Sequence, residues 1–327
     1  MKINGMRVLI VHTDLEQNDS AANMEVLRQA DEISAALTAL EAKPSVASYK
    51  DAARKAKDSK PDLIFNLVEA VNGTDRDLYK AALAFNNSYY PYTGSNHKCL
   101  QALSDKVAMK RVMAEHDILT PMWHKFSEPD SFFHKGEYII KPLFEHGSHM
   151  ISGSNIVKLL DAEDADEKIA KMFPVKTGEF FAERFIDGRE FNVSVLEVDG
   201  EPVVLPLAEI VFEGYGSKPK IVCEKAKWDE SSEEYHKTVR TFDTVEKHSR
   251  LEGKIIKICT ECWNIFKMSG YGRVDIRVDK IGEPYVLEIN ANPSLASDAG
   301  FFAACSRDGY DYKKMVELIL KSAMRHK

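Results

Sequence analysis

The sequence predicts a mixed α/β protein, in which a parallel α/β domain is followed by segments rich in antiparallel β structure. Over residues 1–95, short apolar runs alternate with helical patterns, as in parallel sheets covered by helices. From Glu179 onward, β-rich runs are separated by Asp-Gly pairs, which are typical of hairpin turns. The length of 327 residues allows about two or three domains.

The N-terminal segment contains strands that are short apolar runs and helices whose apolar residues follow the spacing of one helix face. This alternation favours a parallel sheet. In chain order, we expect strand Arg7–His12, helix Ser20–Leu40, strands Val46–Tyr49 and Asp62–Leu67, helix Asp77–Phe85, and a short closing strand with a turn over Tyr89–Ser95.

The middle of the chain contains a predicted helix, a predicted strand and a loop. Helix Ala102–His116 precedes a break at Thr120-Pro121. Pro142 follows strand Glu137–Lys141 and is expected to stop its regular pairing, because proline has no amide proton to donate. Two glycines and two serines between Phe144 and Gly153 predict a mobile loop.

The C-terminal part is predicted to be an antiparallel meander with two further helices. The strands are joined by tight turns at Asp187-Gly188 and Asp199-Gly200. We expect strands Phe180–Ile186, Arg189–Val198 and Pro202–Phe212, a polar surface loop over Gly214–Lys237, helix Lys254–Lys267, a hairpin of Gly272–Asp279 and Tyr285–Asn290, and helix Tyr312–Met324.

Composition excludes several classes of protein. The net charge of -7 argues against a surface built to bind nucleic acid or anionic lipid. No apolar run approaches the roughly 18–20 residues of a membrane span, and residues 1–6 lack the pattern of a signal peptide. The five cysteines are an odd number in a chain of this length, which argues against a disulfide scaffold and favours the cytoplasm.

The hairpin Gly272–Asn290 carries the sharpest cluster of chemical groups. If Asp279 pairs with Pro284, Asp275 lies directly opposite Glu288, and like charges in facing positions repel. A hard divalent cation such as Mg²⁺, held by carboxylate and amide oxygens, would relieve this repulsion. The plain alternative is a salt-bridged strand face in which Arg273 and Arg277 neutralise the acids. The two asparagines of the Asn290–Pro293 break favour the metal site, because a plain strand needs no such turn-forming amides.

Lys106 and Lys141 form a second candidate group with the loop that follows Lys141. A lysine at a strand end beside a Gly/Ser loop offers the charge and the backbone donors that phosphates need. Neither a GxxxxGK[ST] nor a GxGxxG sequence occurs, so P-loop and dinucleotide-binding fingerprints are absent. A solvated lysine beside a surface turn remains the plain alternative.

Glu183, Phe185 and Glu190 form a third group. Glu183 and Phe185 share one strand face, where a carboxylate and an aromatic ring suit an adenine, and Glu190 suits ribose hydroxyls. Ordinary strand alternation explains the same pattern equally well. The Cys259–Cys262 pair lies on an apolar helix stripe and is interpreted as core. His146 and His149 lack a third metal ligand in the sequence.

Seven motifs, taken in order, resemble D-alanine–D-alanine ligases and their ATP-grasp relatives. They are PYTGS (91–95), Lys106, IIKPLFEHGSHMI (139–151), ERFIDGREFNV (183–193), AKW (226–228), GRVDIRVD (272–279) and LEINANPS (287–294). The resemblance extends from Pro91 almost to the C-terminus and more loosely over the N-terminal domain. It implies an ATP-grasp fold with an N-terminal α/β domain (residues 1–95), a central subdomain (96–182) and a C-terminal subdomain (183–327) that together clamp ATP.

The resemblance also implies a role for each matching residue. Lys106 and Lys141 contact the ATP phosphates, and Ser148 closes over the γ-phosphate. Glu183 takes the adenine amino group, Glu190 binds ribose, and the base pocket is completed by the backbone of Arg184, Phe185 and Ile186 and by Leu287. Asp275, Glu288 and Asn290 hold two Mg²⁺ ions, with Mn²⁺ as an alternative. Arg273 stabilises the oxyanion, and Lys227 steadies the transferred phosphoryl group.

The implied activity is ATP-dependent joining of a small-molecule carboxylate and amine through an acyl-phosphate, in a cytoplasmic homodimer. Departures from the D-alanine enzymes lie where the amino acids would sit. His12–Glu16 replaces a glycine-rich turn, Asn66–Glu69 replaces a histidine-glycine turn, Trp228 replaces a tyrosine, and the family's Gly and carboxylate-binding Ser fall near Ser294 and Ala299. Glu25 matches the amine-binding glutamate only loosely. Different substrates are therefore expected. A small-molecule kinase and a non-catalytic ATP-binding protein remain alternatives.

Overall fold

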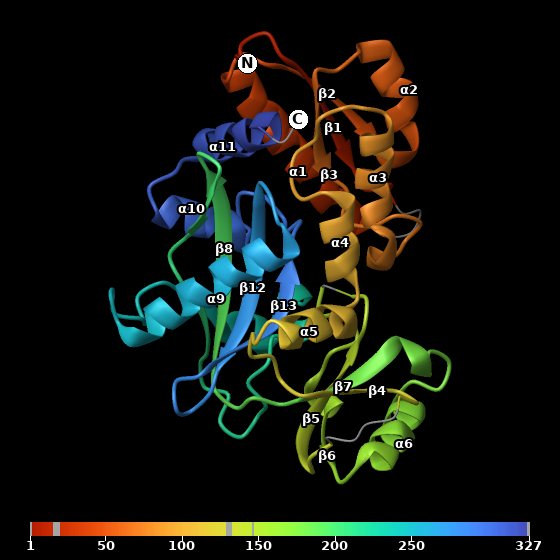
Figure 1. The fold of residues 1–327 in the computed structure, drawn as a ribbon, viewed down its shortest axis with the longest axis vertical. Helices are drawn as coiled ribbons and strands as arrows, with labels where there is room; N and C mark the ends of the chain where they lie inside the picture. The colour runs from red at the N-terminus through yellow and green to blue at the C-terminus, as the bar shows by residue number, and fades with distance from the viewer. Residues whose placement is uncertain (1, 16–19, 129–132, 146, 326–327) are drawn as a thin grey trace.

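The computed structural model describes residues 2–15, 20–128, 133–145 and 147–325 and contains three β-sheets arranged along the long axis of the molecule (Figure 1). The N-terminal sheet has the strand order β2-β1-β3, the central sheet β4-β7-β5-β6, and the C-terminal sheet β11-β10-β8-β12-β13, with β9 also paired to β8. The described strands are β1 Arg7–His12, β2 Lys43–Ser48, β3 Leu63–Leu67, β4 Trp123–Lys125, β5 Gly136–Pro142, β6 Ile156–Leu159, β7 Phe180–Arg184, β8 Arg189–Val198, β9 Glu201–Val204, β10 Ala208–Phe212, β11 Thr238–Thr241, β12 Tyr271–Val278 and β13 Pro284–Asn290.

Helices cover the sheets and join them. The described α-helices are α1 Ser20–Ala39, α2 Tyr49–Ser59, α3 Tyr79–Asn87, α4 His97–Ser104, α5 Lys106–Glu115, α6 Ala162–Met172, α7 Glu224–Trp228, α8 Glu233–Lys237, α9 Arg250–Phe266, α10 Gly300–Arg307 and α11 Tyr312–Arg325, and short 3₁₀ turns occupy Asp75–Asp77, Gly153–Asn155 and Thr177–Glu179. In this part of the chain, no helix is long and apolar enough to cross a membrane.

The N-terminal sheet is parallel, as predicted. His12 at the end of β1 is level with Ser48 of β2 and Leu67 of β3, so the carboxyl ends of all three strands meet at one edge. In open parallel sheets this edge is where ligands bind. The predicted strand over Tyr89–Ser95 is wrong in extent, because only Tyr92 forms an isolated bridge, to Ile64.

Two predictions for the middle of the chain are wrong. The helix over Ala102–His116 is broken at Asp105, whose extended backbone lets its side chain accept hydrogen bonds from the Val107 and Ala108 amides, at 2.9 and 3.0 Å, and so begin α5 at Lys106. Pro142 does pair, with Phe180. Its missing amide proton costs no ladder bond, because β6 extends along β5 only as far as Ile139.

The Asp187-Gly188 turn is not a hairpin, since β7 belongs to the central sheet and β8 to the C-terminal sheet. The chain crosses here from one sheet to the other. At Gly188 it runs so close to β12 that a Cβ atom would lie 1.9 Å from the Val278 carbonyl oxygen. The predicted hairpin at Asp199-Gly200 is confirmed by the pairing of β8 with β9.

The segment Gly214–Lys237, predicted to be a surface loop, contains α7 and α8 instead. It folds because Ile221, Cys223 and Ala226 are buried and pack with Ile139 of β5. This packing brings α7 beside the loop that follows β5. The polar composition of the segment conceals these few apolar anchors.

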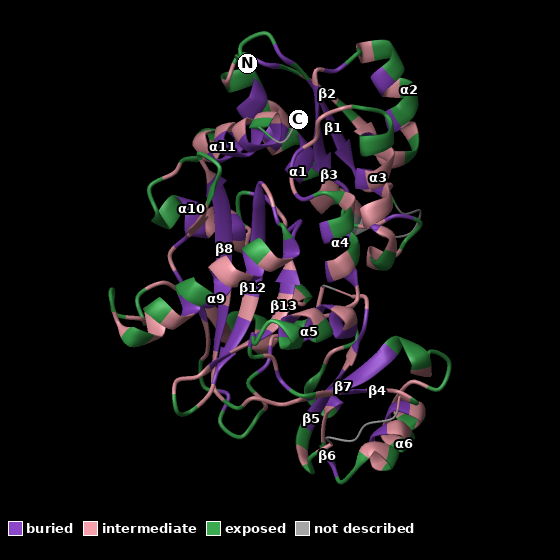
Figure 2. Cartoon of the chain, in the orientation of Figure 1, coloured by how far each residue is buried: buried purple, intermediate pink, exposed green. Residues whose placement is uncertain are grey.

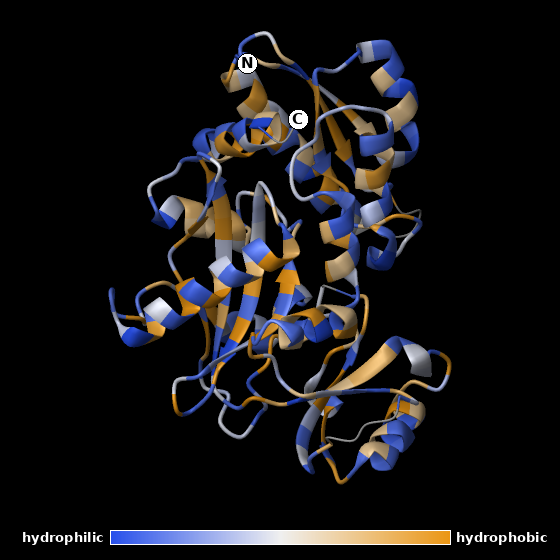
Figure 3. Cartoon of the chain, in the orientation of Figure 1, coloured by the Kyte–Doolittle hydropathy of each residue, from blue (hydrophilic) through white to orange (hydrophobic). Residues whose placement is uncertain are grey.

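The two C-terminal helices pack against the N-terminal domain. One buried cluster contains Ile10 and Leu37 together with Phe301 and Ile319. The strands of the sheets are largely buried in Figure 2 and carry many apolar residues in Figure 3, as do the helix faces that pack on them. The three-part division at residues 95 and 182 stays a prediction, and residue 182 lies inside β7.

Candidate active site

The candidate metal ligands lie on the β12–β13 hairpin. Asp275 is directly opposite Glu288, which confirms the predicted pairing. The register that produces it differs from the prediction: Pro284 pairs with Val278, and a β-bulge then takes up Leu287 as an extra residue. The bulge restores the alignment that brings the two carboxylates face to face.

Basic and amide groups surround these two carboxylates. Arg273 binds Asp275 through two hydrogen bonds of 2.7 and 2.8 Å, and Asn192 of β8 donates to Asp275 at 2.8 Å. The Nζ atom of Lys106 lies 3.7 Å from Glu288. Burial alone would lower the pKa of Arg273, but the neighbouring Asp275 raises it above its ordinary value, so the guanidinium stays charged.

The donor atoms on this hairpin fit a hard divalent cation. Asp275 and Glu288 supply carboxylate oxygens, and the Asn290 side-chain oxygen, which accepts a hydrogen bond from the Asn292 amide at 2.8 Å, keeps a second lone pair. Within the described ranges, no three His, Cys, Asp or Glu residues are grouped to hold a metal ion. The Asn290 side-chain oxygen is therefore the candidate for a third protein ligand on this hairpin.

Lys227 faces this hairpin from α7. Burial, and then the charge of Arg273, lower its pKa, while Glu288, Asp275 and Glu69 oppose the shift. These influences place the ammonium group among the charged groups of the hairpin. Its Nζ atom also lies 5.0 Å from the centre of the Trp228 ring, a cation–π distance.

The loop after β5 is held against α7. Trp228 donates a hydrogen bond to the Gly147 carbonyl at 2.8 Å, and the His149 ring stacks on the Trp228 ring with centroids 5.6 Å apart. Ser148 lies between these contacts with a left-handed backbone (φ 63°). His149 is therefore engaged in the loop, and His146 lies outside the described residues. The AKW motif and the glycine loop thus meet in space, as the resemblance implies.

Glu183 on β7 is almost completely buried between two lysines. Its carboxylate oxygens lie 2.5 Å from Lys141 Nζ and 2.6 Å from Lys110 Nζ. Burial would raise the pKa of Glu183, but the two ammonium groups together lower it, so the carboxylate stays ionised. The sequence analysis missed Lys110, whose only signal was its position one helical turn after Lys106.

The end of β7 and the two residues after it leave one backbone amide, that of Ile186, available to a nucleotide base. The amides of Arg184 and Phe185 already donate to the Met122 and Glu137 carbonyls, at 2.7 and 2.9 Å. Among the described residues, the Ile186 amide has no acceptor. The Arg184 side chain donates a hydrogen bond to the Lys135 carbonyl at 3.0 Å and is therefore engaged within the protein. The bulged Leu287 is half-buried.

Glu190 is held by Arg277, a second residue that the sequence analysis assigned differently. Arg277 donates to Glu190 at 2.6 and 3.1 Å and to the Ile186 carbonyl at 3.1 Å, and its guanidinium lies 5.2 Å from the Phe185 ring centre. Arg277 thus joins the Glu183–Ile186 segment to Glu190. Of the two arginines in the plain salt-bridge alternative, Arg273 pairs with Asp275, whereas Arg277 pairs with Glu190.

The N-terminal domain places Glu69 next to this group, just beyond the carboxyl end of β3. The Val68 carbonyl accepts a hydrogen bond from Asn292 at 2.9 Å, and Gln29 of α1 donates to Glu69 at 3.3 Å. Burial, helped by the charges of Glu25 and Asp75, raises the pKa of Glu69 to about 7, against the lowering effect of the Gln29 hydrogen bond. Water still reaches this exposed carboxylate, so its desolvation is partial.

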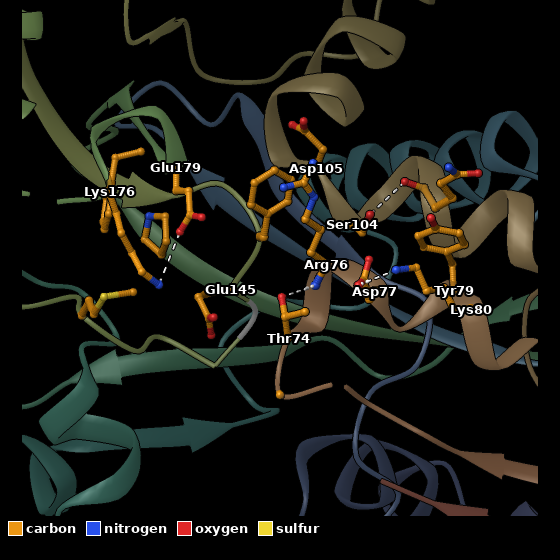
Figure 4. A pocket seen from close by; sticks show the side chains of 16 residues that line it. Thr74, Arg76, Asp77, Tyr79, Lys80, Ser104, Asp105, Glu145, Lys176 and Glu179 are labelled. Atoms are coloured by element: carbon orange, nitrogen blue, oxygen red, sulfur yellow. Dashed lines mark hydrogen bonds and ion pairs between the residues drawn. The ribbon is translucent and has the colours of Figure 1, made fainter. Parts of the chain in front are cut away.

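A cavity of about 750 Å³ adjoins the glycine loop but contains none of the predicted site residues (Figure 4). Its ionic groups are largely paired within the protein, Lys80 with Asp77 at 2.6 Å and Lys176 with Glu179 at 3.5 Å. It is lined by Gly73, Thr74, Arg76, Asp77, Tyr79, Lys80, Gln101, Ser104, Asp105, Pro142, Phe144, Glu145, Met150, Lys176, Glu179 and Phe180.

The two antiparallel sheets, one with Lys141 and Glu183 and the other with Asp275 and Glu288, define an ATP-grasp ligase. Solved structures have the same fold: D-alanine–D-alanine ligase from Bacillus anthracis complexed with ATP matches with a TM-score of 0.72 at 20% identity, over 98% of each chain. That from Coxiella burnetii matches with a TM-score of 0.70 at 16% identity, over 99% of this chain and 95% of its own.

Sequence comparison then identifies the family. Residues 114–321 match the family model for the D-ala D-ala ligase C-terminus, so the chain belongs to that family. D-alanine–D-alanine ligase from Aquifex aeolicus is 26% identical over 81% of this chain and 84% of its own. The uncharacterized protein y4sG from Sinorhizobium fredii is 28% identical over 80% of this chain and 75% of its own. The chain is thus an ATP-dependent C–N ligase similar to D-alanine–D-alanine ligases.

Proposed function

We propose that the protein joins a carboxylate to an amine through an acyl-phosphate, with release of ADP and phosphate. The observation that carries this proposal is the facing pair Asp275 and Glu288 with Arg273 and Lys227 beside it. This arrangement provides metal ligands and two cations where negative charge develops during phosphoryl and acyl transfer.

Each residue of the site then has a proposed task. Lys106, Lys141 and Ser148 bind the ATP phosphates. Glu183, the Ile186 amide and Leu287 hold the adenine, and Glu190, positioned by Arg277, holds the ribose. Asp275, Glu288 and Asn290 bind two Mg²⁺ ions, which when bound neutralise phosphate charge, and Asn192 orients Asp275. Mn²⁺ is an alternative to Mg²⁺.

The residues act in two stages. Lys227 and Arg273 first stabilise the phosphoryl group as it moves from ATP to the substrate carboxylate, which becomes an acyl-phosphate with a good leaving group. The amine then attacks the carbonyl carbon, Arg273 stabilises the oxyanion, and phosphate leaves. The contacts of Trp228 and His149 with the glycine loop keep water from hydrolysing the acyl-phosphate.

We propose substrates other than two D-alanines. Support comes from Asn66–Glu69, which replaces the family's histidine-glycine turn and whose Val68 carbonyl accepts a hydrogen bond from Asn292, just after the β12–β13 hairpin. Glu69 then receives the substrate amine, with Glu25 behind it. All five cysteines are unpaired thiols, which supports the cytoplasm. Met24 and Leu27 expose apolar side chains on α1, which supports a homodimer through the N-terminal domain.

The proposed activity is tested by phosphate release from ATP and Mg²⁺ with D- and L-amino acids, singly and in pairs. We expect release that requires an amino acid and that falls by at least about 100-fold in Asp275→Asn. Formation of D-Ala–D-Ala at a rate far above every other product would contradict the substrate proposal. ADP with a stable phosphorylated product and no free phosphate would contradict the ligase.

The pH profile of kcat should report Lys227. The ammonium form steadies the phosphoryl group, and burial with the Arg273 charge lowers the Lys227 pKa. Activity should therefore fall as pH rises through a value below that of an ordinary lysine. Lys227→Arg should move this alkaline limb upward, because a guanidinium stays charged. An unchanged limb in Lys227→Arg would assign it to another group.

A further inference from the structure

Lys110 is a buried cation that the proposed chemistry does not use. Its side chain is fully inaccessible to solvent, and its Nζ atom contacts Glu183 at 2.6 Å and the Thr120 hydroxyl at 2.7 Å. Burying an ammonium group is unfavourable unless it is paired and hydrogen-bonded. Hydrophobic residues of similar volume in place of a whole buried ion pair are often neutral or stabilising, so packing alone does not explain a buried lysine–glutamate pair here.

Lys110 is also one cation more than charge neutrality requires. Lys141 alone, 2.5 Å from Glu183, would balance that carboxylate. The two lysines differ in access, because the Lys141 side chain is 15% exposed and the Lys110 side chain is 0% exposed. Lys141 can therefore turn toward a ligand, whereas Lys110 cannot. When Lys141 contacts ATP phosphates, as the proposed function requires, Lys110 remains as the partner of Glu183.

The hydrogen bonds around Lys110 connect the two sheets of the ATP clamp. Glu183 lies on β7 in the central sheet. Thr120, which accepts from Lys110, donates to the Val286 carbonyl of β13 at 2.8 Å, and the Val286 amide donates to Leu119 at 2.8 Å. Val286 directly precedes the bulge at Leu287. Lys110 thus fixes the Glu183 carboxylate relative to the strand that carries the metal ligands.

We propose that Lys110 is a positioning residue that holds Glu183 as an oriented, ionised hydrogen-bond acceptor, and so makes the site select a base with an exocyclic amino group. An ionised carboxylate only accepts hydrogen bonds, so it favours the 6-amino group of adenine and disfavours the 6-oxo group of hypoxanthine. Lys110 acts through Glu183 and does not touch the nucleotide. This inference rests on the proposed adenine-binding role of Glu183.

The test measures dissociation constants of ATP and ITP, whose base lacks the 6-amino group, for the full-length protein. Lys110→Met should weaken ATP binding about tenfold, the size of one lost charge-assisted hydrogen bond. It should also reduce the preference for ATP over ITP, because Glu183 loses the partner that keeps it an acceptor. Lys110→Arg, which retains the charge, should retain most of the ATP affinity and most of the preference for ATP over ITP. A loss of fold stability alone would weaken the binding of ATP and of ITP by the same factor.

A double-mutant cycle with Glu183→Gln separates the two proposals. If Lys110 acts through Glu183, Lys110→Met should change ATP affinity by less than about twofold in the Glu183→Gln background. The Lys110 inference would be overturned if the fold-losses of ATP affinity in the two single variants multiplied in the double variant. Unchanged ATP affinity in Lys110→Met would also overturn it. Unchanged ATP affinity in Glu183→Gln would instead overturn the proposed role of Glu183.

Thr120→Val extends the test to a variant that leaves the charges of Lys110, Lys141 and Glu183 in place. It removes the hydroxyl that links Lys110 to Val286. The preference for ATP over ITP should decrease, as in Lys110→Met, but by a smaller factor. Should Lys110→Met fail to fold, as judged by circular dichroism, Thr120→Val and Lys110→Arg decide: an ATP/ITP preference unchanged in Thr120→Val, or lost in Lys110→Arg, would overturn the inference.

Discussion

Replacing Arg273 by methionine is expected to lower kcat by about 100- to 1000-fold, the usual effect of removing one donor to a developing oxyanion. The guanidinium lies at 2.7 and 2.8 Å from Asp275 and close enough to Lys227 to lower its pKa. The affinity for ATP should change little, because Arg273 is proposed to act on charge that appears only during the reaction. Single-turnover kinetics with an active amino acid pair measure both quantities.

Arg189→Met is the matched control for Arg273→Met. Arg189 lies on the neighbouring strand β8 and binds Glu209 through two hydrogen bonds of 2.8 and 2.7 Å, the same type of ion pair. It is outside the proposed site, so its removal should leave kcat within about twofold. A similar loss of kcat in both variants would show that the effect of Arg273 is on strand structure and would contradict its catalytic role.

Asp275→Asn is expected to lower kcat/KM by at least about 100-fold and to raise the Mg²⁺ concentration needed for half-maximal rate. The substitution keeps the shape of the side chain but removes the negative charge that balances Arg273 and binds the cation. Titration of activity with Mg²⁺ at saturating ATP measures the effect.

Asp164→Asn is the control for Asp275→Asn. Asp164 is ion-paired with Lys168 at 2.7 Å on α6, away from the hairpin. Its rate and its Mg²⁺ dependence should equal those of the unmodified protein. If Asp275→Asn showed an unchanged Mg²⁺ dependence despite a lower rate, the hairpin would not be the metal site.

Local sequence patterns determined most of the separate elements. The apolar runs of β1 and β3 and the amphipathic pattern of α9 depend on burial of nearby residues, which periodicity reports directly. Elements with weak patterns were not predicted: the three-residue strand β4 and the helices α2 and α10. The break at Asp105 was missed because a helix cap and a polar helix position look alike in sequence.

The sequence also determined that two carboxylates face each other on the β12–β13 hairpin, because both strands and their turn lie within one short segment. Asp275 meets Glu288 as expected, although a bulge at Leu287, which no local signal marks, produces the alignment. Motif order predicted which residues belong together, and the structure brings α7 to the glycine loop and Lys106 to Glu288.

Only the tertiary structure decided which partners these residues take. Glu183 and Lys110 are 73 positions apart, and Arg277 and Glu190 are 87 apart, so no periodicity relates them. The assignment of β7 and β8 to different sheets likewise depends on where each strand buries its side chains, and the Asp-Gly turn between them gave the opposite indication. Residue types and spacing fix what a segment can do locally, whereas long-range packing in a low-dielectric interior selects the ion pairs that position it.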